Sequence, residues 1–208
     1  MKDITIKARG RGDWEEWKLG DSMFVCSVLN HFKSVRVHVV NKDSEGNKLI
    51  RELSDTIFKD NYEFEMVNGV KGDLIYPDQF YLENNVPMIE YLNPTIFDNY
   101  KKYVTVQNWS KQGSRSLPPN AFNGITKNIE VVNLNNAKGN YTLKELFDTV
   151  YNAEFHLGNI SGICTLAMSC RIPTQLYMKK EHRASAKKWD YALECVYRDK
   201  NVTIREFQ

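Results

Sequence analysis

The sequence predicts an α/β fold in which strands and helices alternate along the chain and the strands form parallel sheets. Strand-type and helix-type hydrophobic patterns alternate over most of its length. The stretch 141–178 has the pattern of helix, strand, tight turn, helix and strand, which contains a βαβ unit. A connector at 84–100, with two prolines among Asn and Asp residues, precedes a strand that starts a second sheet. We therefore expect two small domains, residues 1–95 and 96–208.

The composition is that of a soluble globular protein. The 208 residues are 42% hydrophobic and 26% charged, which suits one large domain or two small ones. No apolar run approaches the roughly 20 residues that span a membrane, and the polar start of the chain is unlike a signal peptide. Cys26, Cys164, Cys170 and Cys195 form no CxxC pair. Reduced core thiols and a cytoplasmic location are expected.

The first half contains a series of short elements. An alternating pattern predicts the first strand, and an apolar helix face follows Gly20-Asp21-Ser22. The predicted elements are strands at 3–8, 35–40, 63–67 and 73–76, with helices at 23–32 and 48–54.

Asp21, near the start of the first helix, has two interpretations. An Asp at this place commonly caps the helix, which is the favoured interpretation from the sequence. Because it lies just beyond a strand-to-helix loop, it could instead face a cleft and act as a general base.

The second half continues the alternation. Predicted strands lie at 103–107, 129–134, 153–158, 172–178 and 202–204. Predicted helices lie at 94–100, 122–127, 143–150 and 164–170, and residues 179–188 lead into a closing helix.

Two polar segments of this half could bind an anion. The turn Asn159–Gly162 joins the carboxyl end of a strand to the start of a helix, where free N–H groups attract phosphate. The loop 108–118 carries Ser110, Lys111 and Arg115, whose side chains could hold a diphosphate. The alternatives are an ordinary α/β corner that binds nothing and a flexible surface loop.

Charge is distributed unevenly along the chain. Residues 1–100 have a balance of −5, whereas residues 101–208 have a balance of +7. A basic half suits a phosphate-bearing ligand or nucleic acid, although a solvated basic face explains it equally well. The four histidines stand apart from one another, so no zinc site is expected.

Several of these elements, taken in order, resemble glycosyltransferase family 9, the heptosyltransferase group. They are Gly20-Asp21 before a helix, the Lys/Arg loop ending at Pro118, the segments 141–146 and 157–162, and then Leu166-Ala167 and Ile172-Pro173-Thr174. The resemblance is strongest over 101–178. It implies a reduced GT-B arrangement of two Rossmann-like halves, in which the first binds the acceptor and the second binds a sugar nucleotide.

The resemblance also implies roles for particular residues. Asp21 matches the family's candidate general base. Ser110, Lys111 and Arg115 match polar and basic residues of the diphosphate loop. The Ser161-Gly162 pair, which follows Asn159, matches the Ser/Thr-Gly turn, and Tyr141 falls where the family packs a side chain against the nucleotide base.

Two positions depart from the family pattern. Ile160 replaces an acidic residue and Thr165 replaces a frequent histidine, and both changes remove polar contacts to the donor. The chain is also short for two full domains of roughly 150 residues each.

Three hypotheses follow. The first is a metal-independent glycosyltransferase that uses a nucleotide-diphosphate sugar and no further cofactor, since the sequence has no DxD motif. Its acceptor would be a carbohydrate or a modified base of phage DNA. The second is an inactive module that binds a nucleotide or sugar nucleotide, and the third is a structural α/β protein.

Overall fold

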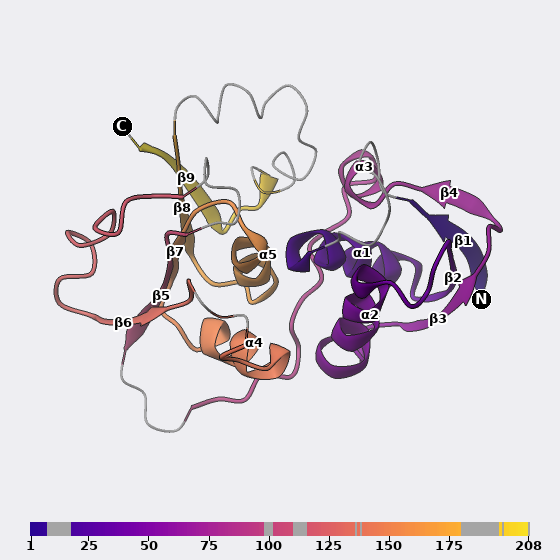
Figure 1. The fold of residues 1–208 in the computed structure, drawn as a ribbon, viewed down its shortest axis with the longest axis horizontal. Coiled ribbons are helices and arrows are strands. Elements are labelled where there is room, and N and C mark those ends of the chain that lie inside the picture. The colour runs from indigo at the N-terminus through magenta and orange to yellow at the C-terminus, as the bar shows by residue number, and fades with distance from the viewer. Residues whose placement is uncertain are drawn as a thin grey trace. The chain divides into compact units, whose positions relative to one another are not determined.

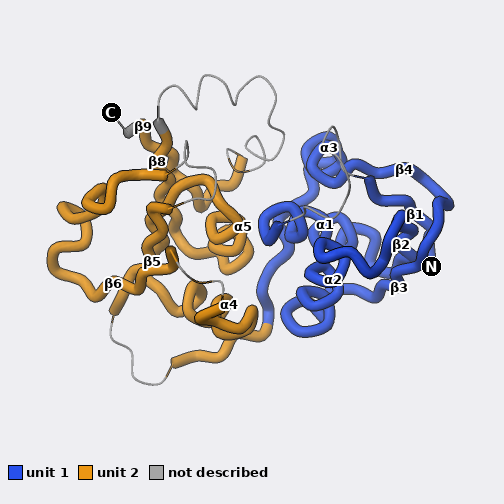
Figure 2. The backbone as a smooth tube through the Cα atoms, in the orientation of Figure 1, with its two compact units in different colours: residues 1–92 blue, residues 93–208 orange. Residues whose placement is uncertain are grey.

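The computed structural model describes residues 1–7, 18–97, 102–109, 116–135, 137, 139–179, 196 and 198–207. It divides into two compact units, Met1–Leu92 and Asn93–Gln208 (Figure 2). Each unit is built on its own parallel sheet, of four strands in the first and five in the second. The predicted α/β class with two parallel sheets is confirmed.

The first unit has the strand order β3-β2-β1-β4 (Figure 1). Its elements are β1 (Lys2–Ile6), α1 (Leu19–Phe32), β2 (Ser34–Val39), α2 (Glu45–Glu52) with a π-helical turn (Leu53–Ile57), β3 (Glu63–Asn68), β4 (Asp73–Ile75) and α3 (Pro77–Glu83). Two successive crossovers, through α1 and α2, run in the same direction along the sheet. Right-handed crossovers of this kind place both helices on one face.

The strands of the first unit alternate between an apolar and a polar face. Ile4, Ile6, Val35 and Val37 are fully buried on the side of the helices. On the opposite face Asp3 accepts a hydrogen bond from His38 Nε2 (2.7 Å) and pairs with Lys71 Nζ (3.0 Å). These partners lower the pKa of Asp3 to about 2.

The chain crosses this polar face between β3 and β4 without a helix. Lys71 N–H donates to Thr5 Oγ1, which in turn donates to Lys71 O, both at 2.9 Å. Gly72 has φ +76°, and a Cβ there would lie 1.9 Å from Asp3 O. Glycine is therefore required where this short connection lies against β1.

The second unit has the strand order β6-β5-β7-β8-β9, again with all neighbours parallel. Its elements are β5 (Tyr103–Gln107), β6 (Glu130–Asn133), α4 (Leu143–Tyr151), β7 (His156–Gly158), α5 (Gly162–Ser169), β8 (Thr174–Lys179) and β9 (Val202–Phe207). The predicted βαβ unit is present as β7-α5-β8. Among the described residues, no helix has the length and apolar character needed to cross a membrane.

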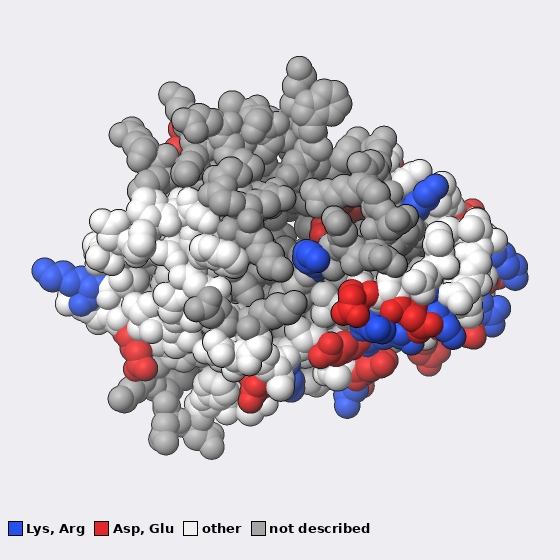
Figure 3. All heavy atoms as spheres, viewed as in Figure 1, with Lys and Arg blue, Asp and Glu red and all other residues white. Residues whose placement is uncertain are grey.

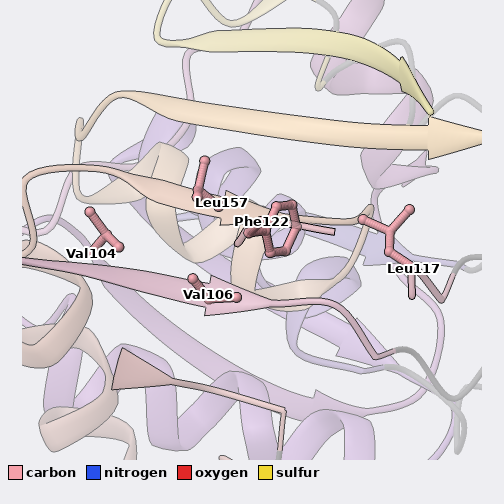
Figure 4. Close-up of a cluster of buried hydrophobic side chains, with 5 residues drawn as sticks. All are labelled: Val104, Val106, Leu117, Phe122 and Leu157. Carbon is pink, nitrogen blue, oxygen red and sulfur yellow. The ribbon is translucent and has the colours of Figure 1, made fainter. Parts of the chain in front are cut away.

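The two faces of this sheet are covered differently. Val104, Val106 and Leu157 pack against Leu117 and Phe122 from the segment that follows β5 (Figure 4). The other face carries buried polar side chains, including Thr105, His156 and Thr174. This face lies against the helices, since Tyr103 OH, on the same side of β5, donates to Thr149 O of α4 (2.7 Å).

The prediction of a helix at 122–127 is wrong, because these residues form turns. Phe122 is 3% exposed and anchors the segment in the core. Its carbonyl accepts from the N–H groups of Ile125 (2.9 Å) and Thr126 (3.1 Å) and from Thr126 Oγ1 (3.0 Å). With these bonds closing on one carbonyl and Gly124 between them, the helical ladder does not continue.

The predicted short helix at 94–100 is also absent over 94–97, and residues 98–100 lie outside the described part of the chain. The backbone here bonds to side chains of α4 and its cap instead of to itself. Thr95 N–H donates to Asp148 Oδ1 (2.9 Å) and Phe97 N–H donates to Asn152 Oδ1 (3.1 Å). Asn152 Nδ2 returns a bond to Thr95 O (2.8 Å). The connector is thus anchored to the second unit.

Replacing Asn152 by alanine should destabilise the second unit by about 1–2 kcal/mol, because it removes the hydrogen bonds of the Asn152 side chain to Thr95 O and Phe97 N–H. Asn152 is 4% exposed. Urea unfolding measures the loss, and faster amide exchange of residues 93–97 locates it. Asn128→Ala is the control, since Asn128 is exposed in the same unit. Equal stability of the two variants would contradict the anchoring role.

Candidate functional site

The second sheet changes direction between β5 and β7. The chain passes from β5 to β6 on one side and then returns to place β7 on the other. In open parallel sheets, ligands bind at the carboxyl ends of strands on either side of such a switch point. Here these ends are Gln107 and Gly158, which are paired in register.

The first turn of α5, beside Gly158, lacks the usual side-chain cap. Ser161 is the N-cap residue, but its hydroxyl donates to Gln107 Oε1 and makes no bond to the helix. In the described structure, no partner is present for the N–H groups of Gly162, Ile163 and Cys164. By contrast, Thr142 caps α4 in the ordinary way, accepting from Glu145 N–H (3.2 Å). The first turn of α5 also contains no acidic residue. These features suit an anion.

The loop after β5 is closed at its base by asparagine side chains. Asn135 Oδ1 accepts from the N–H groups of Asn108 and Trp109, both at 2.9 Å. Leu117 N–H then donates to Asn108 O (2.7 Å), which joins the two stems of the segment 109–116. The residues before and after the predicted cationic loop therefore lie together, at the carboxyl end of β5.

Asn159 connects this loop base to the start of α5. Its N–H donates to Gln107 O (3.1 Å) and its Nδ2 donates to Asn108 O (3.2 Å). Asn159 is 1% exposed, and its Oδ1 is buried without a partner among the described residues. The turn 159–162 and the stems of the loop are consequently held together.

A buried histidine lies beneath the turn. His156 Nδ1 is 3.1 Å from Thr105 Oγ1, whereas Nε2 has no partner in the described structure. A Cβ on Gly158 would lie only 2.5 Å from that Nε2. The imidazole thus occupies the space that a side chain at 158 would need. Burial lowers the pKa of His156 to about 4, so the ring is neutral near pH 7.

The structure brings together three of the predicted site residues. Asn159, Ser161 and Gly162 meet at the switch point, as described above. Thr165 lies one turn further along α5, is 4% exposed and donates its N–H to Ser161 O (3.4 Å). Tyr141 is half-buried before α4. Ser110, Lys111 and Arg115 lie outside the described residues.

Asp21 belongs to the first unit. It is the third residue of α1, not the N-cap, because the helix begins at Leu19 and Lys18 holds the cap position. Asp21 Oδ2 accepts from Lys18 N–H (3.4 Å), which supports the helix start. A carboxylate in this first turn is also favoured by the helix dipole.

Sequence reasoning missed Gln107, Asn108, Asn135 and His156. Gln107 and His156 lie in predicted strands. A polar residue in a strand is expected from the alternation of polar and apolar positions, so neither residue indicates a site. The available signal was that Gln107 ends a strand and Asn108 begins the candidate phosphate loop. Asn135 is 27 residues away from Asn108, so only the parallel pairing of β5 and β6 brings them together.

The described residues that meet at the switch point, Gln107, Asn108, Asn159 and Ser161, are uncharged. Figure 3 shows charged side chains of both signs on the first unit, and few on the described surface of the second unit in that view. Cys26, Cys164 and Cys170 are buried free thiols, and burial raises the pKa of Cys26 to about 12. No group of three or more His, Cys, Asp or Glu side chains within the described ranges could hold a metal ion.

Comparisons with solved structures identify the fold. E. coli heptosyltransferase WaaC, solved with ADP, matches with a TM-score of 0.51 at 9% identity, over 100% of this chain and 94% of that one. A glycosyl transferase family 9 protein from Veillonella parvula matches with a TM-score of 0.50 at 9% identity, over 99% and 86%. The chain has the fold of the family 9 glycosyltransferases.

A third similar structure is longer than this chain. The iron-containing dodecameric glycosyltransferase TibC from enterotoxigenic E. coli H10407 matches with a TM-score of 0.54 at 12% identity, over 84% of this chain. The match covers 57% of TibC, so this chain corresponds to little more than half of that protein. No protein-family profile and no curated protein matches the sequence. The predicted GT-B-like fold is confirmed at the level of structure.

Proposed function

We propose that this protein binds a nucleotide-diphosphate sugar at the switch point of its second unit and transfers the sugar to an acceptor hydroxyl. The uncapped start of α5 carries the proposal. A Ser at the N-cap normally stabilises its helix by about 1 kcal/mol, yet the Ser161 hydroxyl is turned to Gln107. The N–H groups of residues 162–164 are thereby left for a phosphate.

The fixed base of the loop 109–116 supports the same assignment. Asn108, Asn135 and Asn159 hold both stems of the loop beside the helix start. Lys111 and Arg115 belong to that loop. Two cations attached there, together with the amides of α5, would stabilise the charge that grows on the leaving diphosphate.

In this mechanism the acceptor oxygen attacks the anomeric carbon, the bond from that carbon to the diphosphate oxygen breaks, the nucleoside diphosphate leaves, and Asp21 takes the proton of the acceptor hydroxyl. The acceptor is a carbohydrate or, as the basic second half of the sequence suggests, a modified base in phage DNA. Duplex DNA binding that weakens steeply with added salt would favour the latter.

A thermal-shift screen against nucleotide-diphosphate sugars tests the binding step. A ligand present at 100 times its Kd should stabilise the protein by about 2.7 kcal/mol, which raises its Tm by several degrees. Arg115→Ala and Lys111→Ala should each reduce the shift. A protein whose Tm responds to no nucleotide would be a structural α/β protein instead.

Turnover separates the enzyme from an inactive binding module. Asp21→Asn should lower sugar transfer at least tenfold with unchanged donor affinity, because only proton removal is lost. Glu145→Gln is the matched control, since Glu145 is also a third-position carboxylate in a helix and accepts from Thr142 N–H (2.8 Å). Binding without transfer by the wild type would establish the module.

A further inference from the structure

Gln107 lies at the centre of the switch point, although no predicted role includes it. It is the last residue of β5, is 9% exposed and pairs in register with Gly158 of β7. Its carbonyl accepts from Asn159 N–H, so its backbone is fixed by the turn that leads into α5. The side chain therefore starts from a well-defined position beside the helix start.

Ser161 fixes the orientation of the Gln107 side chain. The serine hydroxyl donates to Oε1, so the carbonyl side of the amide is occupied. The amide group is planar, so Nε2, with its two N–H donors, lies on the other side of the amide carbon from Oε1. Nε2 has no hydrogen-bond partner among the described residues. Both N–H donors of this nearly buried residue are therefore available to an acceptor supplied from outside the chain.

We propose that Gln107 Nε2 donates a hydrogen bond to a phosphate oxygen of the ligand that binds at the start of α5, and that Ser161 is the residue that positions it. This inference rests on the proposed function, because it assigns a further contact in the same site. Ser161 is directly bonded to Gln107 and directly precedes the free N–H groups of α5. An anion on those amides would thus lie next to the Gln107 amide.

Two substitutions at Gln107 distinguish a phosphate contact from a packing role. Gln107→Ala removes the donor and should weaken binding of ADP and of inorganic pyrophosphate about 10-fold or more, as expected for a hydrogen bond to a charged group. Gln107→Glu keeps the shape and can still accept from Ser161, but places a carboxylate beside the phosphate. Its affinity should fall further than that of Gln107→Ala, whereas a packing role predicts that the glutamate variant binds better than the alanine variant.

The matched control is Gln175→Ala, and Ser161→Ala tests the positioning residue. Gln175 is a glutamine of β8 that bonds to Tyr177 OH (3.4 Å), and its register partner Leu157 lies on the opposite face from Gly158. Its replacement should change both affinities less than twofold. Ser161→Ala should weaken both ligands while leaving the Tm of the ligand-free protein nearly unchanged, since the hydroxyl does not cap α5.

Isothermal titration of ADP, UDP, GDP and pyrophosphate into the wild type and these variants decides between the outcomes. If the wild type binds a nucleoside diphosphate and both Gln107 variants bind it equally well, the inference is wrong and the binding step of the proposed function stands. If only pyrophosphate binds, in a Gln107-dependent way, the inference stands and the proposed function fails. If neither class of ligand binds the wild type, both are overturned.

Discussion

Replacing Gly158 by alanine is expected to destabilise the second unit by about 2–3 kcal/mol, the usual cost of forcing extra atoms into a packed site. The new Cβ would lie 2.5 Å from His156 Nε2 and 3.4 Å from Gln107 O. The imidazole is fully buried and bonded to Thr105 Oγ1, so moving it away from the new Cβ would disturb that bond. Urea unfolding, with limited proteolysis to identify the unit that opens, measures the effect.

A control and a double variant make this expectation specific. Gly124→Ala should change stability by no more than about 0.5 kcal/mol, because nothing lies within 4 Å of a Cβ at that position. In Gly158→Ala/His156→Ala the ring that causes the clash is gone, so the double variant should be more stable than the sum of the two single losses predicts. Strict additivity would show that the two positions do not share this space.

Acidification from pH 6.5 to pH 4 is expected to cost the second unit about 3 kcal/mol through His156 alone. In the unfolded chain the imidazole takes up a proton near its ordinary pKa of 6.5, whereas burial lowers the pKa in the folded protein to about 4. The unfolded state therefore binds more protons in this range, and the free energy of unfolding falls with pH. Above pH 6.5, His156 is neutral in both states and the free energy of unfolding is not reduced by its protonation.

The test compares variants over that pH range. His156→Gln removes the titrating ring, so its free energy of unfolding should depend less on pH between 6.5 and 4.5 than that of the wild type. His31→Gln, at an exposed position in the first unit, should leave the pH dependence of the free energy of unfolding of the second unit unchanged. The pKa of Asp3 is about 2 in the folded protein, so protonation of Asp3 lowers the free energy of unfolding mainly below pH 4 and does not obscure the result. A wild-type slope retained in His156→Gln would contradict the assignment.

The turn 159–162 could be predicted from the sequence because it depends on local chemistry. A short strand that ends at Gly158, a four-residue turn in which Asn159, Ser161 and Gly162 are small or polar, and an apolar helix specify a strand-to-helix corner without reference to the rest of the chain. Local pattern failed at 94–97 and 122–126, where the backbone bonds to α4 and packs around Phe122. In both segments, contacts distant in sequence override a weak helical tendency.

The sequence alone thus determined the alternation of strands and helices, the existence of two parallel sheets and the candidate anion turn, because these depend on the spacing of apolar residues and on short polar segments. Only the tertiary structure decided that β5 and β7 are neighbours. That pairing places Gln107 beside Ser161 and Asn108 beside Asn159, and the pairing of β5 with β6 joins Asn108 to Asn135. Strand order is set by long-range packing, and no spacing within either segment encodes it.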